Sequence, residues 1–380
     1  MESLVLLVLL IFLALSALNF LTAFRLERVK TKSQSTLPSA SILIPARNEA
    51  HNLVHLIPSL LLSQFKNFEI IILDDNSEDN TKDVALKLFE KSAISYQVIQ
   101  GEPWHLDLGL SGKNFACHQL ALKATGDILI FCDADVTLSP LVIERTLSFI
   151  QQYPQAAGLS CFPKIQATSL LEQLVLPWIM QIPLALSLPL RFAWRSQFAA
   201  MQVANGQWLA IRRKAYFAAG GHQSLGLHVI EDVQMAKAMI KKSLGGIIPV
   251  IATEDLTVNM YPNWSEMIAG FSKNLVGIYG GKSYFFILLL LFLNLFFFYP
   301  FFRLIQLDAV SFLLIGILFL IRFFVALTFG RTLFRSIMDF IFLGPSLVVL
   351  DYFAGLILKN YWNKNTDWKG RKTSTRGFSL

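Results

Sequence analysis

The chain has 380 residues, of which 54% are hydrophobic, and a formal net charge of +7 at pH 7. A mean hydropathy of +0.51 is too high for an ordinary soluble enzyme, so a chain without membrane segments is excluded. The positive charge suits lipid headgroups and phosphates, and because no nucleic-acid recognition motif accompanies it, we expect no nucleic-acid partner.

Residues 1–24 form an apolar segment in which Glu2 is the only ionisable side chain. A span of about 20 apolar residues crosses a bilayer. The segment has neither a basic start nor a small-residue cleavage site, which predicts a retained transmembrane anchor and not a signal peptide. A basic linker follows at 25–39. Because positive flanks stay in the cytosol, we expect the N-terminus outside and the next domain inside.

From residue 40, short apolar runs alternate with amphipathic segments. The runs predict strands and the segments between them predict helices: strands at 41–44, 69–73, 95–99 and 127–132, and helices at 52–63, 79–91 and 113–124. This alternation is typical of an α/β, Rossmann-like fold with a parallel sheet that helices cover on both faces.

Acidic pairs close two of these predicted strands. Asp74-Asp75 follows the run at 68–73, and Asp133-Ala134-Asp135 follows the run at 127–132. Ligands of open α/β sheets gather at the carboxyl ends of strands. Carboxylates at that edge of a basic chain indicate a divalent metal and the phosphates of a nucleotide, although a helix cap explains either pair alone.

Residues 170–194 are apolar, but three prolines interrupt them and argue against one straight spanning helix. We predict a segment that lies in the membrane interface, with Trp178 and Trp194 as anchors at the headgroups. A buried core helix is the alternative. The three cysteines, Cys117, Cys132 and Cys161, lack zinc-ligand spacing and are predicted to be small buried hydrophobes.

Residues 283–358 form the C-terminal membrane segments, with spans predicted at 283–302 and 310–328. A third apolar stretch, 337–358, is interrupted by a Gly-Pro pair. Four crossings would leave the C-terminus outside, whereas the basic tail at 359–380 belongs in the cytosol. A third stretch that is re-entrant or lies on the surface resolves this conflict. These features predict a multi-pass protein of the cell membrane whose central domain faces the cytosol.

Five segments in this order resemble an inverting family 2 glycosyltransferase of the A-type fold: 41–49, 73–79, 111–113, 131–135 and 230–232. The resemblance covers residues 40–280 and implies an A-type catalytic domain that takes a UDP-sugar and Mg²⁺ or Mn²⁺. Two further stretches, 219–224 and 368–371, resemble membrane enzymes that glycosylate lipids, carotenoids in particular.

The resemblance assigns the donor side of the site to residues at two strand ends. Pro45, Arg47 and Glu49 end the first strand, where a nucleotide base is expected. Asp75 is expected to accept a hydrogen bond from uracil N3–H, since a carboxylate has no competing donor; Asp74 is expected to shape the turn. Lys113 is expected to hold ribose or diphosphate oxygens, although a solvated surface lysine is the alternative.

The resemblance also implies a metal ligand and a base. Asp133 is expected to face the ribose, and Asp135 to hold Mg²⁺ or Mn²⁺ on the diphosphate. Asp232 is the candidate general base that takes a proton from the acceptor hydroxyl. Glu231 and Asp232 open a predicted helix at 232–241, where the dipole also favours carboxylates, so a capping role is compatible with catalysis.

On the acceptor side we expect Asn205, His222 and Glu231, although a structural role for His222 stays open. The stretch 267–274 lacks the Gln-x-x-Arg-Trp motif of processive members, which favours a single transfer. A charged Asp232 would repel a carboxylate acceptor, and its presence therefore favours a hydroxyl.

The sequence thus predicts a membrane-bound, metal-dependent enzyme that moves a hexose, glucose from UDP-glucose, onto the hydroxyl of a lipid acceptor. Carotenoid is the favoured lipid. Alternatives are a ceramide, diacylglycerol or polyprenyl phosphate acceptor, a processive polysaccharide synthase, and a non-catalytic membrane subunit.

Overall fold

The computed structural model describes residues 2–167, 169–228, 230–261, 263–278, 283–363, 367–368 and 371–372. The chain divides into two compact units. The sheet unit comprises Phe24–Gln166 and Arg191–Met260, and the helical unit comprises Met1–Ala23, Ala167–Leu190 and Tyr261–Leu380. Most of the predicted tail at 359–380, and half of the 368–371 motif, lie outside the described residues.

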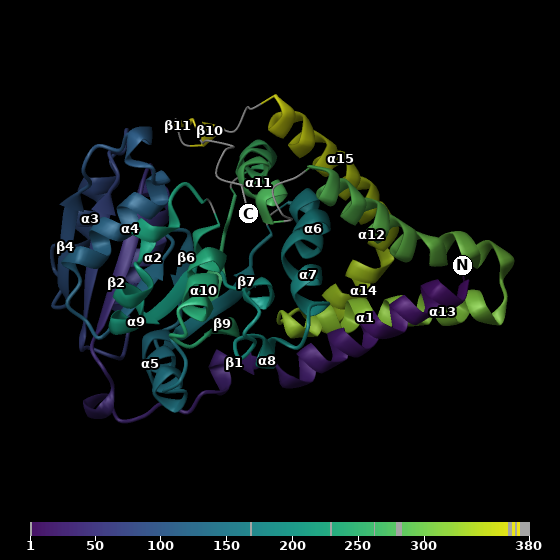
Figure 1. Ribbon diagram of the computed structural model, residues 1–380, viewed down its shortest axis with the longest axis horizontal. Coiled ribbons are helices and arrows are strands. Elements are labelled where there is room, and N and C mark those ends of the chain that lie inside the picture. Colours follow the sequence, from purple (N-terminus) through teal and green to yellow (C-terminus); the bar gives the residue numbers. More distant parts are fainter. Residues whose placement is uncertain are drawn as a thin grey trace. The chain divides into compact units, whose positions relative to one another are not determined.

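The sheet unit is built on one mixed sheet (Figure 1). Its strands run in the order β1-β9-β7-β8-β5-β2-β3-β4, and β6 pairs with β9. Their bounds are β1 Phe24–Arg25, β2 Ala40–Ala46, β3 Phe68–Asp74, β4 Ser95–Gln100, β5 Ile128–Cys132, β6 Val136–Leu138, β7 Gly158–Ile165, β8 Trp208–Arg212 and β9 Ile247–Val258. From β5 through β2 and β3 to β4 the neighbouring strands are parallel.

The parallel pairing predicted for the strands up to residue 132 is confirmed, whereas β8, which lies beyond them in the chain, is antiparallel to both β5 and β7. A parallel neighbour requires a crossover helix. The chain from β7 to β8 instead leaves the sheet unit at residue 166 and re-enters it at 191. This connection is therefore not the strand–helix–strand crossover that makes neighbouring strands parallel.

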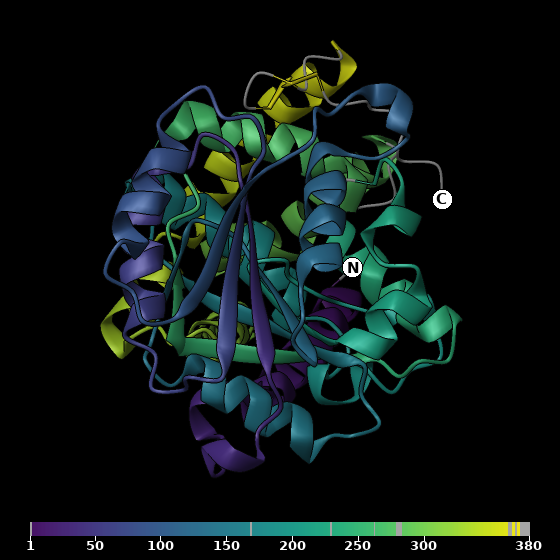
Figure 2. The same ribbon diagram turned by 90° about the vertical axis from the view of Figure 1, so that its left-hand side faces the viewer.

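Helices cover both faces of the sheet (Figure 2). One face carries α2 (Ala50–Leu61), α3 (Thr81–Phe89) and α5 (Val142–Gln152); the other carries α4 (Gly112–Lys123), α9 (Arg213–Ala219) and α10 (Glu231–Lys241). The strand residues alternate between the two cores: Ile42 and Ile44 join one, while Leu43 joins the other. This alternation with a period of two is what makes a strand buried on both faces continuously apolar.

The predicted elements between residues 41 and 132 and the helix at 232–241 are confirmed, each within two residues of the observed bounds. The cysteines are also as predicted, because all three are free and buried. Short 3₁₀ turns complete the chain at η1 Leu26–Arg28, η2 Gln34–Thr36, η3 Leu106–Leu108, η5 Ala199–Met201, η6 His222–Leu225 and η7 Leu304–Gln306.

In the described part of the helical unit, three helices are long and apolar enough to cross a membrane: α1 (Glu2–Thr22), α12 (Ser283–Arg303, extended by η7) and α13 (Ala309–Thr328). They coincide with the predicted spans. The third apolar stretch forms α14 (Leu333–Ile341) and α15 (Leu343–Trp362), bent by 68°. The bend lies just before the Gly-Pro pair, and it is compatible with a broken span or a re-entrant loop.

The apolar segment at 170–194 is divided into short pieces, as its prolines predict: α6 (Leu170–Leu176), the π-helical turn η4 (Pro177–Gln181), α7 (Ile182–Ala185) and α8 (Leu190–Ala193). Trp178 and Trp194 are both buried, so neither indole is exposed in the way an interfacial anchor would be. The remaining elements are α11 (Trp264–Ile278), β10 (Asp367–Trp368) and β11 (Arg371–Lys372).

Candidate active site

The carboxyl ends of β2, β3 and β5 lie side by side because these strands are parallel and in register. Pro45 is the last residue but one of β2, and the Asp75 N–H donates to the carbonyl of Ala46 at 2.7 Å, which joins the two strand ends. Asp133 follows β5 directly. The predicted gathering of carboxylates at one edge of the sheet is therefore present.

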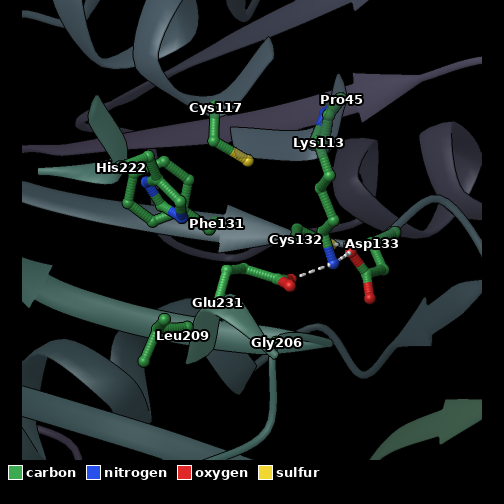
Figure 3. Close-up of a pocket in the computed structure, with 10 residues that line it drawn as sticks. All are labelled: Pro45, Lys113, Cys117, Phe131, Cys132, Asp133, Gly206, Leu209, His222 and Glu231. Carbon is green, nitrogen blue, oxygen red and sulfur yellow. Dashed lines mark hydrogen bonds and ion pairs between the residues drawn. The ribbon is translucent and has the colours of Figure 1, made fainter. Parts of the chain in front are cut away.

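Lys113 lies at the centre of this edge (Figure 3). Ser111 caps α4 by accepting the Asn114 N–H at 3.2 Å, which places Lys113 in the first turn of the helix. Its Nζ atom is 2.7 Å from Asp133 Oδ1 and 2.6 Å from Glu231 Oε1. A solvated surface lysine is thus not what is seen. We call Lys113, Asp133 and Glu231 the lysine triad.

Charge balance inside the triad sets the pKa values of its members. Burial would lower the pKa of Lys113, but the charges of Asp133 and Glu231 outweigh burial and raise it well above its usual value. Burial would raise the pKa of Glu231, yet the Lys113 ammonium holds it below the ordinary range. Lys113 and Glu231 therefore stay charged at neutral pH.

Asp135 lies outside the triad and has a different environment. Burial, and then the charges of Asp133 and Glu49, raise its pKa well above the usual value. Its Oδ1 atom is buried and has no hydrogen-bond partner among the described residues. Burial also raises the pKa of Asp133, although Lys113 opposes this. The Asp135 shift shows that its carboxyl group lies in a desolvated space close to the charges of Asp133 and Glu49.

A divalent cation fits these two carboxylates. Within the described ranges no three His, Cys, Asp or Glu side chains gather closely enough to form a complete protein cage. Mg²⁺ does not require one, because it is typically held by one or two carboxylates together with substrate phosphates and water. The orphaned Asp135 oxygen beside Asp133 is the donor set that such an ion needs.

Asp232 is the second residue of α10 and adjoins the triad through Glu231. Its Oδ1 accepts the Val233 N–H at 2.7 Å. Burial, followed by the negative charge of Glu231, raises the pKa of Asp232 to about 7. Neighbouring carboxyl groups whose pKa values are pushed apart are typical of acid–base sites.

On the predicted donor side, Arg47 acts on backbone atoms. Its Nη1 donates to the carbonyls of Asp75 at 2.9 Å and Asn76 at 2.7 Å, which holds the turn after β3. The Asp74 carboxylate accepts the Ser77 N–H at 3.2 Å in the same turn, as expected of a turn-shaping residue. Glu49 accepts from the Asn52 amide at 2.7 Å.

On the predicted acceptor side, Asn205 and His222 are both buried and bonded. The Asn205 amide donates to Gln207 Oε1 at 2.9 Å. His222 is held by the hydroxyl of Tyr216, 2.9 Å from Nδ1. Burial lowers the pKa of His222 to about 3, so its imidazole is neutral. The sequence positions of Asn205 and His222 do not predict that His222 pairs with Tyr216.

The pocket in Figure 3 is lined by the lysine triad and by His222, whereas Asn205, Asp135 and Asp232 are not among its lining residues. A cavity of about 10 Å³ lies among the lysine triad, Cys117, Phe131 and His222, and it has room for about one water molecule. The structure thus brings Lys113, Asp133, Glu231 and His222 together around one space.

Gly206 leaves room for the lysine triad. A Cβ atom at this position would lie 3.2 Å from Glu231 Oε1 and 3.3 Å from Lys113 Nζ. We expect Gly206→Ala to lengthen the ion pair and to lower the free energy of unfolding by about 1 kcal/mol, measured by thermal unfolding. Gly316→Ala is the matched control, because nothing lies within 4 Å of its added Cβ. An unfolding midpoint lowered equally in both variants would contradict this explanation.

Comparison with known proteins gives consistent similarities. Residues 41–216 match the family model described as glycosyl transferase family 2. The chain is 30% identical over 254 residues to 4,4'-diaponeurosporenoate glycosyltransferase of Staphylococcus haemolyticus, covering 65% of this chain and 63% of that protein. It is 26% identical over 265 residues to the protein of the same name in Staphylococcus aureus strain N315, covering 68% and 67%. The match thus spans just under two thirds of the first relative.

Among solved structures, the chain resembles the mannosyltransferase PcManGT from Pyrobaculum calidifontis, determined in complex with GDP-Man and Mn²⁺. The TM-score is 0.54 at 13% sequence identity, over 96% of this chain and 100% of that one. At this identity the likeness concerns the fold alone, and it confirms the predicted fold class.

Proposed function

We propose that the chain, whose residues 41–216 match the model of glycosyl transferase family 2 and whose fold is of the A type, is an inverting, metal-dependent hexosyltransferase of that family. It moves glucose from UDP-glucose to the hydroxyl of a carotenoid-like lipid. The names of the relatives support a lipid acceptor of this class. The observation that carries the proposal is Asp232, a carboxyl group with a pKa of about 7 beside the lysine triad.

In the proposed reaction Asp232 takes the proton of the acceptor hydroxyl. The acceptor oxygen then attacks the anomeric carbon from the face opposite UDP, which inverts the configuration. A base whose pKa lies near the working pH combines a large ionised fraction with enough basicity. Glu231 keeps the pKa of Asp232 there, and the Lys113 ammonium in turn keeps Glu231 charged.

The remaining residues bind the donor. Asp75 accepts from the uracil N3–H, and Arg47 fixes the turn that presents Asp75. Lys113 and Asp133 orient the ribose and diphosphate, with the proton staying on Lys113 Nζ. Mg²⁺ or Mn²⁺, held by Asp135 beside Asp133, would neutralise the charge that develops on the diphosphate leaving group.

The proposed setting is the cell membrane, with the sheet unit in the cytosol, where UDP-sugars are made available. The three apolar helices support membrane association. The basic residues that follow α1 support the orientation, because positive flanks remain cytosolic. The partners are then a UDP-sugar donor, a lipid acceptor and the bilayer.

A second candidate is transfer to a lipid carboxylate, which would form a glycosyl ester. The relatives are named for 4,4'-diaponeurosporenoate, which is a carboxylate. An ionised carboxylate needs no base, and a protonated Asp232 would avoid repelling it. We favour the hydroxyl because a pKa of about 7, to which burial and then Glu231 raise Asp232, suits a general base.

The test uses membranes that contain the full chain, radiolabelled UDP-glucose and Mg²⁺, with a carotenoid alcohol and the matching carotenoid acid as alternative acceptors. Label in a single organic-phase product from the alcohol supports the proposal, and its mass identifies the acceptor. Label only from the acid establishes the second candidate. Both candidates are refuted if the label enters a water-soluble polymer. They are also refuted if no UDP-hexose gives a labelled product.

The pH profile gives a further prediction. We expect kcat/KM to rise with pH through a midpoint near 7 and to level off above it, because Asp232 acts when it is ionised. Glu231→Gln removes the adjacent negative charge that raises the Asp232 pKa, so the midpoint moves to lower pH. Glu254→Gln, at an exposed carboxylate of the same unit, is the control and leaves the midpoint in place. An unmoved midpoint in Glu231→Gln would assign the titration to another group.

A further inference from the structure

The helical unit contains an arginine within an apolar helix. Arg322 lies in α13, and its side chain is only 3% exposed. Its Nε and Nη1 atoms have no hydrogen-bond partner in the part of the chain that the structure describes. A charged side chain inside a membrane segment is costly, and it is usually retained because a partner or ligand satisfies it.

Arg322 lines a cavity of about 230 Å³ between α6, α13, α14 and α15. The lining combines charged side chains, those of Arg322, Arg335 and Asp339, with apolar ones that include Leu174, Phe334 and Met338. At about 30 Å³ for each water molecule in the liquid, the space is large enough for a headgroup and the first carbons of a chain.

The groups around the cavity leave its positive charge unbalanced. The Asp339 carboxylate accepts from Arg331, so its Oδ1 is already engaged. Arg335 donates to Gln173 Oε1 at 2.8 Å, which is a neutral partner. Three arginines and one aspartate thus give an excess of two positive charges, of which the Arg322 charge is buried and the Arg335 charge is exposed.

The indole of Trp178 fixes Arg322 in place. The Arg322 Cζ atom lies 5.4 Å from the ring centroid, within the range of a cation–π contact. Trp178 Nε1 in turn donates to Ser346 Oγ at 2.7 Å. The guanidinium is therefore held from one side, and Arg322 also lines a cavity with an apolar wall. Such a site is suited to an amphiphile with a negative head.

We propose that this cavity binds the anionic headgroup of a lipid, whose carboxylate or phosphate oxygens accept from the Arg322 guanidinium while its chain lies along Leu174, Phe334 and Met338. A lipid with a carboxylate head and a lipid with a phosphate head both have negatively charged oxygens joined to an apolar chain, and this is what the cavity requires. This site lies within the helical unit and goes beyond the proposed transfer, because its occupancy requires no sugar nucleotide.

The test is equilibrium binding of radiolabelled oleate to the purified full chain in a neutral maltoside detergent. We expect saturable binding, competition by oleoyl lysophosphatidic acid, and little competition by methyl oleate or inorganic phosphate. Relative competition by oleate and the lysophosphatidic acid distinguishes a carboxylate from a phosphate head. Arg322→Met is expected to weaken binding about tenfold or more, as loss of charge-assisted hydrogen bonds does.

Lys359→Met is the matched control, since it removes an exposed cation of the same unit outside the cavity, and it leaves binding within about twofold. Should Arg322→Met fail to fold, Met338→Trp fills the space of the chain and is expected to weaken oleate binding without removing charge. The proposal would be overturned if methyl oleate bound as well as oleate, or if inorganic phosphate competed fully. It would also be overturned if the oleate affinity were unchanged in whichever of these two variants folds.

Discussion

Asp232→Asn lowers the turnover number with a carotenoid alcohol by about 10²–10⁴-fold, the contribution typical of a positioned general base. The amide retains an oxygen that can accept the Val233 N–H, so α10 keeps its first turn. It cannot take a proton, and the rise of kcat/KM with pH toward about 7 is expected to vanish together with the rate. Donor affinity stays near that of the unchanged protein, because Asp232 is assigned to the acceptor.

The measurement compares initial rates and donor KM for the unchanged chain, Asp232→Asn and Asp83→Asn. Asp83 is an exposed carboxylate in the first turn of α3, another helix of the same unit, and its loss is expected to leave the rate unchanged. A turnover number that falls only a few-fold in Asp232→Asn with the alcohol would remove Asp232 as the base. If the acid were the better substrate and its rate unchanged, transfer to a carboxylate would replace the first proposal.

Much of the sheet unit is predictable because its signals are local. The strands β2, β3 and β5 are apolar runs bounded by turn residues, and the helices between the strands begin and end at recognisable positions. The acidic pairs follow β3 and β5, so parallel topology alone places them at one edge. The antiparallel β8 was not predictable in this way, because a long irregular excursion precedes it.

The pairing of side chains is less visible in the sequence than their position at the edge. Lys113 and Glu231 lie 2.6 Å apart although 118 positions separate them, and the contact depends on α4 and α10 covering the same face of the sheet. Gly206 is needed for that contact, yet it reads as an ordinary turn residue. Tyr216 and His222 pair only because the turn after α9 folds back. These features are products of tertiary packing.

The second large effect is expected at Asp135. Asp135→Asn lowers turnover at saturating Mn²⁺ by about 10²-fold or more, because a metal ligand that stabilises developing charge contributes several kcal/mol. The same change is expected to raise the thermal unfolding midpoint at pH 7. Burial and the neighbouring Asp133 and Glu49 raise the Asp135 pKa well above its usual value, so the folded state disfavours the charge that the variant removes.

The sign of this stability effect depends on pH. The unfolded carboxyl group ionises near its ordinary pKa of about 3.9, whereas the folded one resists ionisation, so the charge costs stability only above that value. The gain in midpoint from Asp135→Asn should therefore shrink as the pH falls toward about 4.

Mn²⁺ should raise the midpoint of the unchanged chain and of Asp83→Asn, and it should have little effect on Asp135→Asn. A midpoint of Asp135→Asn that rises with Mn²⁺ as in the unchanged chain would show that another residue holds the ion. A variant that is inactive and also less stable at pH 7 would instead identify Asp135 as a structural carboxylate. If Asp135 is a metal ligand whose charge is unfavourable in the folded state, removing that charge stabilises the folded protein.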